Sequence, residues 1–236
     1  MDTKTNLIPL FKTKFSIGKS ILSEKDVLRL SKESGLVVTT IVDDSFYGFR
    51  KIAKVFAEAK QPFVFGISLP VISDTSTSSS KLVFLAKNDK GVDEIRKLYS
   101  KCYCAEDKTL AFVASEISDN VQIAVPFYDS FIYQNVFNFG FHDIDFGLHN
   151  PIYMSESNDH PFDFMIQRVL DKVSKNQQAV KTICYEKRED FMAAQAYRSL
   201  TSRKMGRQPN FQNPRIEGSC SEEFCWESYK ELYSHS

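Results

Sequence analysis

The chain has 236 residues, of which 42% are hydrophobic and 25% are charged, and its 30 basic residues balance its 30 acidic residues. This composition excludes a disordered, collagen-like or coiled-coil protein and is typical of a globular domain with a packed core. The zero net charge also excludes a chain-wide electrostatic attraction to nucleic acid or to an anionic membrane, so any such contact has to be local.

Cysteine usage and hydropathy favour a cytoplasmic protein. Five cysteines are too few, and too irregularly spaced, for the disulfide framework of a secreted protein. No histidine lies near the Cys102/Cys104 or Cys220/Cys225 pair at the spacing of a zinc finger. The N-terminal region has no signal-peptide core, and no apolar run is long enough to cross a membrane. We therefore expect a protein that is neither exported nor membrane-spanning.

Helix-like and strand-like patterns alternate in the first part of the chain. Residues 22–35 have helical periodicity, a serine near the start and a glycine at the end, and the apolar residues 36–42 follow as a buried strand. The same unit repeats as a helix over 48–60 and an apolar strand over 63–69. This alternation predicts an α/β architecture with a largely parallel sheet.

The pattern continues towards the C-terminus. The polar residues 73–80 predict a surface loop or hairpin tip, and residues 109–128 predict two short strands around a turn. Residues 127–153 are rich in aromatic rings, and because no Lys or Arg is interleaved with them we expect these rings to pack in a core or an interface rather than on bases. Further strands are expected over 81–87 and 179–185, and helices over 91–103, 161–176, 189–203 and 221–233.

Residues 82–103, LVFLAKNDKGVDEIRKLYSKCY, form the most specific pattern in the chain. They resemble the stretch LVLLAKNxxGYxNLxKLxSxAY of the N-terminal PHP (polymerase and histidinol phosphatase) domain of C-family bacterial replicative polymerases, the DNA polymerase III alpha subunits. Weaker matches extend over nearly the whole chain and include Phe15-Ser16, NVQIAVPF (120–127), IYMSES (152–157), EDFMAAQAYRSL (189–200) and NPRIEGSCSEEFCWESYKEL (213–232).

The resemblance implies a fold and a division of the chain. It implies a distorted seven-stranded α/β barrel over residues 1–203, followed by a C-terminal extension over 204–236 that resembles the connection to the polymerase palm. Active members of the family hold a cluster of metal ions at one end of the strands and hydrolyse phosphoesters with it. Their ligands are histidines and carboxylates, which bind divalent ions that lower the pKa of bound water and neutralise phosphate charge.

Most of these ligand types are absent from the matching positions of this chain. The family's H-x-H motif falls on Leu10 and Lys12, and the acid and histidine of its T-D-H-G motif fall on Asp43 and Asp44, or one residue earlier when counted back from Gly48. The former ligand positions are, in full, Leu10, Lys12, Asp43, Asp44, Ser68, Tyr128, Asp159, His160, Thr182 and Cys184.

We therefore expect no metal cluster and no other cofactor. A single ion held by Asp43, Asp44, Asp159 and Cys184 stays open as an alternative. The ammonium of Lys12 disfavours a divalent ion, and we expect it to point into the former site and to pair with Asp43 or Asp44. In the other interpretation, these side chains are simply solvated ends of strands.

Three functions are consistent with these residues. The first is a non-catalytic PHP-like scaffold whose partners are replication proteins, namely a proofreading exonuclease, a polymerase core or both. The second is a metal-dependent phosphoesterase or exonuclease with a rearranged site, and the third is a decoy that binds host replication proteins. The chain itself carries no polymerase palm. It is either a piece of a larger polymerase or a stand-alone protein, for instance of a bacteriophage, and acts in a bacterial or phage-infected cytoplasm.

Two surfaces are candidates for contacts with partners. The tail carries large rings that either form a partner surface or anchor the tail to the barrel, namely Phe211, Phe224, Trp226 and Tyr229. A cluster of cations without an acid among them predicts weak phosphate contacts with DNA, or else a solvated helix end, and consists of Arg198, Arg203, Lys204 and Arg207.

Overall fold

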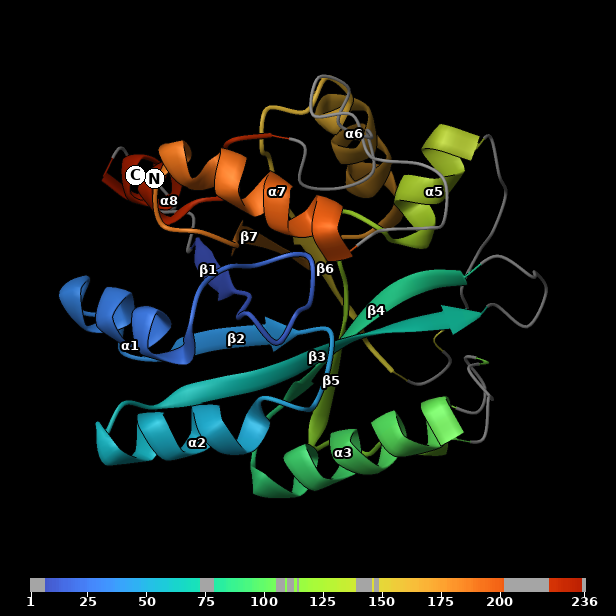
Figure 1. Cartoon of the computed structure of the whole chain (residues 1–236). Coiled ribbons are helices and arrows are strands. Elements are labelled where there is room, and N and C mark those ends of the chain that lie inside the picture. Colours follow the sequence, from blue (N-terminus) through green and yellow to red (C-terminus); the bar gives the residue numbers. More distant parts are fainter. Residues whose placement is uncertain are drawn as a thin grey trace, which may run out of the picture. The chain divides into compact units, whose positions relative to one another are not determined.

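The computed structural model describes residues 7–72, 79–104, 109, 113, 115–138, 146, 149–201 and 221–234. Seven strands in this part of the chain form a closed mixed barrel in chain order, which confirms the predicted α/β barrel (Figure 1). The strands are β1 (Ile8–Phe11), β2 (Thr39–Asp43), β3 (Phe63–Ile72), β4 (Ser79–Ala86), β5 (Val121–Val125), β6 (Ile152–Ser155) and β7 (Gln177–Ile183).

Helices connect and follow the strands. They are α1 (Glu24–Glu33), α2 (Phe49–Glu58), α3 (Asp89–Cys104), α5 (Phe131–Asn138), α6 (Asp163–Val173), the 3-10 turn η1 (Arg188–Asp190), α7 (Phe191–Thr201) and α8 (Trp226–Ser234). Among the described residues, no helix has the length and apolar character that crossing a membrane requires.

The strand directions differ from the expectation of a largely parallel sheet. β1 pairs in parallel with β2 and β7, and β5 pairs in parallel with β6. β4, however, is antiparallel to both β3 and β5. The few residues between Ile72 and Ser79 explain the difference, because a parallel crossover needs about a dozen residues whereas a hairpin needs only a few. Of the loop or hairpin tip predicted over residues 73–80, Ser79 and Ser80 instead begin β4, and residues 73–78 lie outside the described residues.

The chain divides into two compact units. Unit 1 contains the described residues of 1–63, 156–160 and 179–236, and unit 2 contains those of 64–155 and 161–178. The domain boundary expected at residue 204 falls between Thr201 and Ser221, outside the described residues, and stays an expectation.

In unit 1, the first helix begins and ends as its sequence predicts. Ser23 is the N-cap of α1 and forms a capping box with Asp26, and Gly35 follows the helix with φ +65°. The buried strand expected from residue 36 begins only at Thr39, because the chain is still closing the helix. Val37 is 83% exposed, although its neighbours in sequence are apolar.

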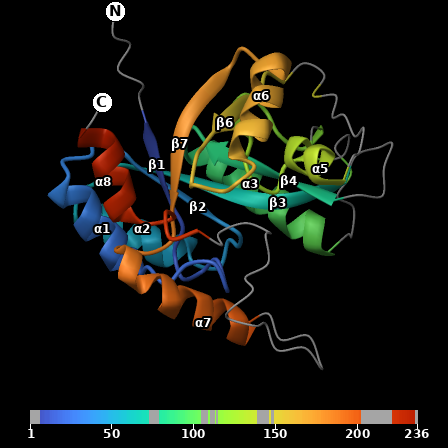
Figure 2. The ribbon, with the colours of Figure 1, turned by 90° about the horizontal axis from the view of Figure 1, so that it is seen from above.

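The described part of the tail belongs to the core of unit 1. Phe224, Trp226 and Tyr229 are each 3% exposed or less, and the Trp226 ring lies 5.3 Å from that of Phe11 in β1. Figure 2 shows α8 close to β1 in this unit. Backbone bonds join the tail to the end of β7, where the Cys184 amide donates to the Phe224 carbonyl at 2.9 Å. These three rings are therefore not a partner surface, because the core of their own unit already covers them. Phe211 lies outside the described residues.

Arg188 joins the turn before α7 to the tail. Its guanidinium donates to Glu223 at 2.9 and 3.0 Å and to Glu231 at 2.6 and 2.8 Å. The Arg188 guanidinium also lowers the pKa of Glu223 to about 2. Such a forked pair of charge-assisted bonds holds α8 in one orientation.

In unit 2, the stretch with the strongest family resemblance packs as a strand and a helix. α3 packs on β4 and β5, and α5 packs on α6. Gly91 is required where α3 approaches β5, because a Cβ atom there would collide with the carbonyl oxygen of Asn120. The aromatic segment contributes Phe127, Phe131 and Tyr133 to buried positions, so core packing explains its described rings.

We expect Trp226→Ala to lower the free energy of unfolding by about 3–5 kcal/mol, because it empties a buried space of indole size beside Phe11. Tyr233→Ala, which truncates a ring that is 63% exposed on the same helix, is the matched control and should cost no more than about 1 kcal/mol. Urea unfolding measures both. Equal effects of the two variants would show that the tail is not part of the core.

Candidate functional site at the ends of strands β1, β2 and β7

The parallel strands of unit 1 bring three loops together at their carboxyl ends. Leu10 of β1 faces Thr40 of β2 on one side and Thr182 of β7 on the other. Lys12 directly follows β1, and Asp43 ends β2. The sequence-predicted positions on these strands and the loops that follow them therefore lie at one end of unit 1.

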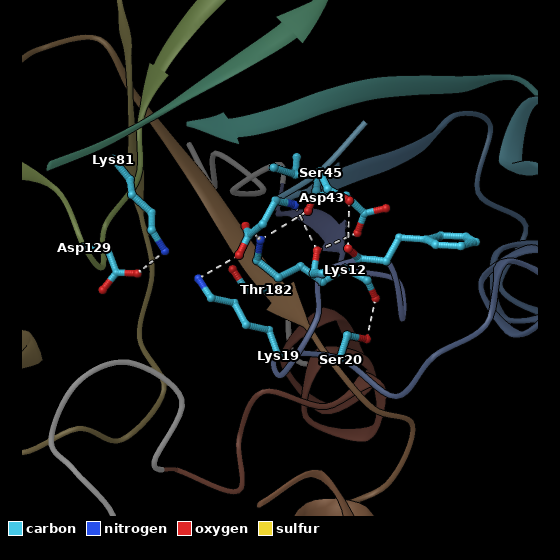
Figure 3. Close-up of polar contacts among 12 residues, drawn as sticks. Lys12, Lys19, Ser20, Asp43, Ser45, Lys81, Asp129 and Thr182 are labelled. Atoms are coloured by element: carbon cyan, nitrogen blue, oxygen red, sulfur yellow. Dashed lines mark hydrogen bonds and ion pairs between the residues drawn. The ribbon is translucent and has the colours of Figure 1, made fainter. Parts of the chain in front are cut away.

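Asp43 is the centre of a buried hydrogen-bond network (Figure 3). Its carboxylate accepts the Thr13 amide at 2.8 Å, the Thr13 hydroxyl at 2.6 Å and the Ser16 hydroxyl at 2.7 Å. The side chain is fully buried, and this burial raises the pKa of Asp43 above its ordinary value. Three of its lone-pair sites are already used by the loop after β1, so Asp43 acts as the anchor of that loop.

Lys12 pairs with the neighbouring acid, as expected from the sequence. Its Nζ lies 2.8 Å from Asp44 Oδ1 and donates to the Val42 carbonyl at 3.2 Å. Lys19 Nζ lies 3.0 Å from the other carboxylate oxygen of Asp44 (Figure 3). One carboxylate therefore bridges two ammonium groups at the place where the family resemblance predicts metal ligands.

A second buried carboxylate, Glu156, lies after β6 and was not identified in the sequence. It accepts the Thr182 amide at 2.5 Å, the Thr182 hydroxyl at 2.9 Å and the Asn158 side-chain amide at 2.8 Å. Burial raises the pKa of Glu156, while burial lowers the pKa of the nearby Lys181, which is 2% exposed. No motif distinguishes Glu156 from other acids, because its role depends on contacts with a strand far along the chain.

Three of the other predicted positions of unit 1 are buried, and Asp159 is exposed. Cys184 is buried, and this burial raises the pKa of its thiol to about 12, so the thiol stays protonated near neutral pH. His160 is 8% exposed and its ring meets the Phe224 ring edge-on at 6.0 Å. Asp159 has φ +55°, in the left-handed region. Leu10 is a buried core residue.

The remaining predicted residues lie elsewhere. In unit 2, Ser68 pairs with Val83 in the hairpin, and the Tyr128 hydroxyl donates to Asp163 Oδ2 at 2.9 Å. Arg198 is in the last turn of α7. The other three predicted phosphate contacts, Arg203, Lys204 and Arg207, lie outside the described residues.

The donor set at the strand ends of unit 1 does not fit a divalent metal ion. Within the described residues, no group of three or more His, Cys, Asp or Glu side chains gathers at metal-binding distance. The buried carboxylates Asp43 and Glu156 are hydrogen-bonded by hydroxyls and amides, and the Lys12 ammonium lies at a former ligand position. An ammonium repels a divalent cation and supplies no lone pair to it.

No family model and no curated protein matches the chain. Among solved structures, it is similar to a proposed metal-dependent phosphoesterase from Bifidobacterium adolescentis, at 15% identity and a TM-score of 0.33, over 43% of this chain and 35% of the other. It is also similar to an amidohydrolase from Chromobacterium violaceum, at 16% identity and a TM-score of 0.29, over 49% of this chain and 44% of the other. The chain thus spans less than half the length of either structure.

We expect Lys12→Met to lower the free energy of unfolding by about 1–3 kcal/mol, between the costs of breaking an exposed pair and a buried one. The pair is partly buried, with side chains 14% and 24% exposed. The matched control is Lys54→Met, since Lys54 is 76% exposed and lies 3.9 Å from Glu58. If urea unfolding gave the same small change for both variants, the Lys12 ammonium would be shown to be solvated.

The raised pKa values of Asp43 and Glu156 predict a pH dependence of stability. Above the ordinary values of 3.8 and 4.5, the unfolded chain releases protons that the folded chain still holds. The free energy of unfolding therefore falls as the pH rises from these ordinary values through the raised ones. Asp43→Asn and Glu156→Gln should each make this fall shallower in urea titrations from roughly pH 4 to pH 7. The exposed Glu33→Gln is the control, and an unchanged slope in both buried variants would contradict the assignment.

Proposed function

We propose that this chain is a non-catalytic PHP-like barrel of a C-family DNA replication polymerase and that it acts as a scaffold for a polymerase core or a proofreading exonuclease. The pattern over residues 82–103 supports the family assignment. It covers the end of β4 and most of α3, and its apolar positions are those that pack in unit 2. The resemblance therefore concerns residues in the core of unit 2, whereas the positions of the family's metal ligands lie at the strand ends.

The observation that carries the proposal is the ion pair of Lys12 with Asp44. In a hydrolytic barrel, the position of Lys12 would supply an imidazole to a metal ion. Here its Nζ lies 2.8 Å from Asp44, so a positive charge stands where the metal ligand would be. The Asp44 carboxylate also lies 3.0 Å from Lys19, so two ammonium groups share it where a metal ligand would be expected.

Such a polar end does not depend on a metal ion for charge compensation, because Asp43, Asp44 and Glu156 each have donors from the chain itself. The proposed activity is therefore binding, and the partners are proposed from the family resemblance to be replication proteins. The polymerase core is one such partner, since residues 213–232 resemble the connection to the palm.

The experiment that tests this proposal has two readouts. The purified chain, incubated with manganese or zinc and then desalted, should retain less than one ion per chain by elemental analysis, and should not hydrolyse p-nitrophenyl phosphate esters or a DNA 3′ end. Two or more bound ions with hydrolysis would instead favour a phosphoesterase with a rearranged site.

The second readout is copurification. The tagged chain, expressed in its own cell of origin, should bring down a polymerase or exonuclease component. Recovery of replication proteins from a different replicase would indicate a decoy. Recovery of none would contradict the scaffold.

A further inference from the structure

We propose that the loops after β1 and β2 bind single-stranded nucleic acid through a surface centred on Tyr47. We call this the Tyr47 surface and define it by its exposed or half-exposed side chains. This inference goes beyond the proposed function, which concerns protein partners, and it is carried by different residues. The Tyr47 surface consists of Lys14, Phe15, Ile17, Lys19, Tyr47, Arg50 and Lys51.

Positive charge is concentrated in these loops. Residues 12–19 and 44–54 together contain six lysines and arginines but one acid, Asp44, in a chain whose net charge is zero. The two segments therefore carry a local excess of positive charge, although the net charge of the whole chain is zero. A local patch of this kind is the electrostatic signature of binding to a phosphate backbone.

Contacts in unit 1 join the two loops into one surface. The Asp44 amide donates to the Ser16 hydroxyl at 3.0 Å, and the Ser45 hydroxyl donates to the Phe15 carbonyl at 2.9 Å (Figure 3). Gly48 lies so close to the Phe15 ring that a Cβ atom there would overlap it. The cations of one loop and the rings of the other are therefore presented together.

The nearby acids compensate only part of this charge. Glu24, on α1, is 2% exposed and lies 3.4 Å from Lys14 and 2.9 Å from Lys51. Asp44 lies between Lys12 and Lys19, and Glu58 lies 3.9 Å from Lys54. Because Glu24 is buried beneath two lysines that are 42% and 57% exposed, solvent meets the cations rather than the acid.

Exposed rings accompany the cations. Tyr47 is 88% exposed, more than any other large hydrophobic side chain among the described residues, and Ile17 is 71% exposed. The Tyr47 ring meets the half-buried Phe15 ring edge-on at 6.0 Å, which leaves a face of Tyr47 available. Base stacking on an aromatic face is worth about 1–3 kcal/mol per base and needs bases that are not paired.

The first turn of α2, which follows the loop with Tyr47, lacks the acidic residues that a helix N-terminus usually prefers. It contains Arg50 and Lys51 and no acid, and the N-cap of α2, Gly48, supplies no side-chain hydrogen bond. Cations at the positive end of a helix dipole are unfavourable, and an external anion would offset this cost. Departures from local preference of this kind are expected at functional sites rather than in the scaffold.

The combination favours single-stranded nucleic acid over a protein partner. Phosphates would meet Lys14, Arg50 and Lys51, while a base would stack on Tyr47. The end of α7 borders the same loop, because a Cβ atom at Gly18 would collide with the Thr201 hydroxyl. Arg198 lies one turn earlier on α7.

Fluorescence anisotropy with a labelled oligo-dT of about 20 nucleotides tests the proposal on the full chain. We expect binding at low salt that weakens as salt is raised. Tyr47→Ala should weaken it about fivefold or more, and Arg50→Gln should reduce the slope of log affinity against log salt by about 0.7. Tyr103→Ala and Arg96→Gln, on exposed positions of α3, are the matched controls and should change neither quantity.

Three results would overturn the proposal. They are an absence of binding at low salt, equal effects of Tyr47→Ala and Tyr103→Ala, and equal affinity for the oligo-dT and a duplex of the same length. If Tyr47→Ala instead abolished copurification of a protein while the oligo-dT did not bind, the Tyr47 surface would be a protein interface. The scaffold proposal is tested by copurification with the unmodified chain, so the two proposals fail independently.

Discussion

The buried carboxylate of Asp43 is the constraint on which the candidate site depends. A fully buried carboxylate is costly unless hydrogen bonds replace those to water. Here three donors, from Thr13 and Ser16, supply them at 2.6–2.8 Å. Ser16 also accepts the Asp44 amide, so the same hydroxyl fixes both loops. The positions of Lys12 and of the rings around Tyr47 follow from this small network.

The same principle explains how the chain's own donors and cations compensate the acids at the strand ends of unit 1. A cluster of carboxylates needs cations or donors, and a metal ion is one way to provide them. In this chain the Asp44 carboxylate lies between two ammonium groups, while Glu156 is held by Thr182 and Asn158. Asp44 and Glu156 thus have separate partners, and no group of three or more possible metal ligands forms among the described residues.

The tail gives unit 1 its second constraint. Backbone bonds continue from the end of β7 into the tail, where the Trp226 amide donates to the Tyr185 carbonyl at 3.0 Å. The rings of Trp226 and Tyr229 then stack at 4.8 Å, and Arg188 holds Glu223 and Glu231 from the other side. The tail is therefore a structural part of unit 1.

The sequence by itself determined the α/β barrel, the ends of α1 and the pairing of Lys12 with one of the acids at the end of β2. The ends of α1 depend on local periodicity and caps, whereas the barrel and the pairing of Lys12 were expected from the resemblance to the PHP family. Tertiary structure alone decided the late start of β2 at Thr39 and the burial of Trp226. It also decided the role of Glu156, whose donors at Thr182 lie 26 positions away. Burial and hydrogen bonding of this kind depend on which distant segments pack together, and a single sequence contains no local signal for that.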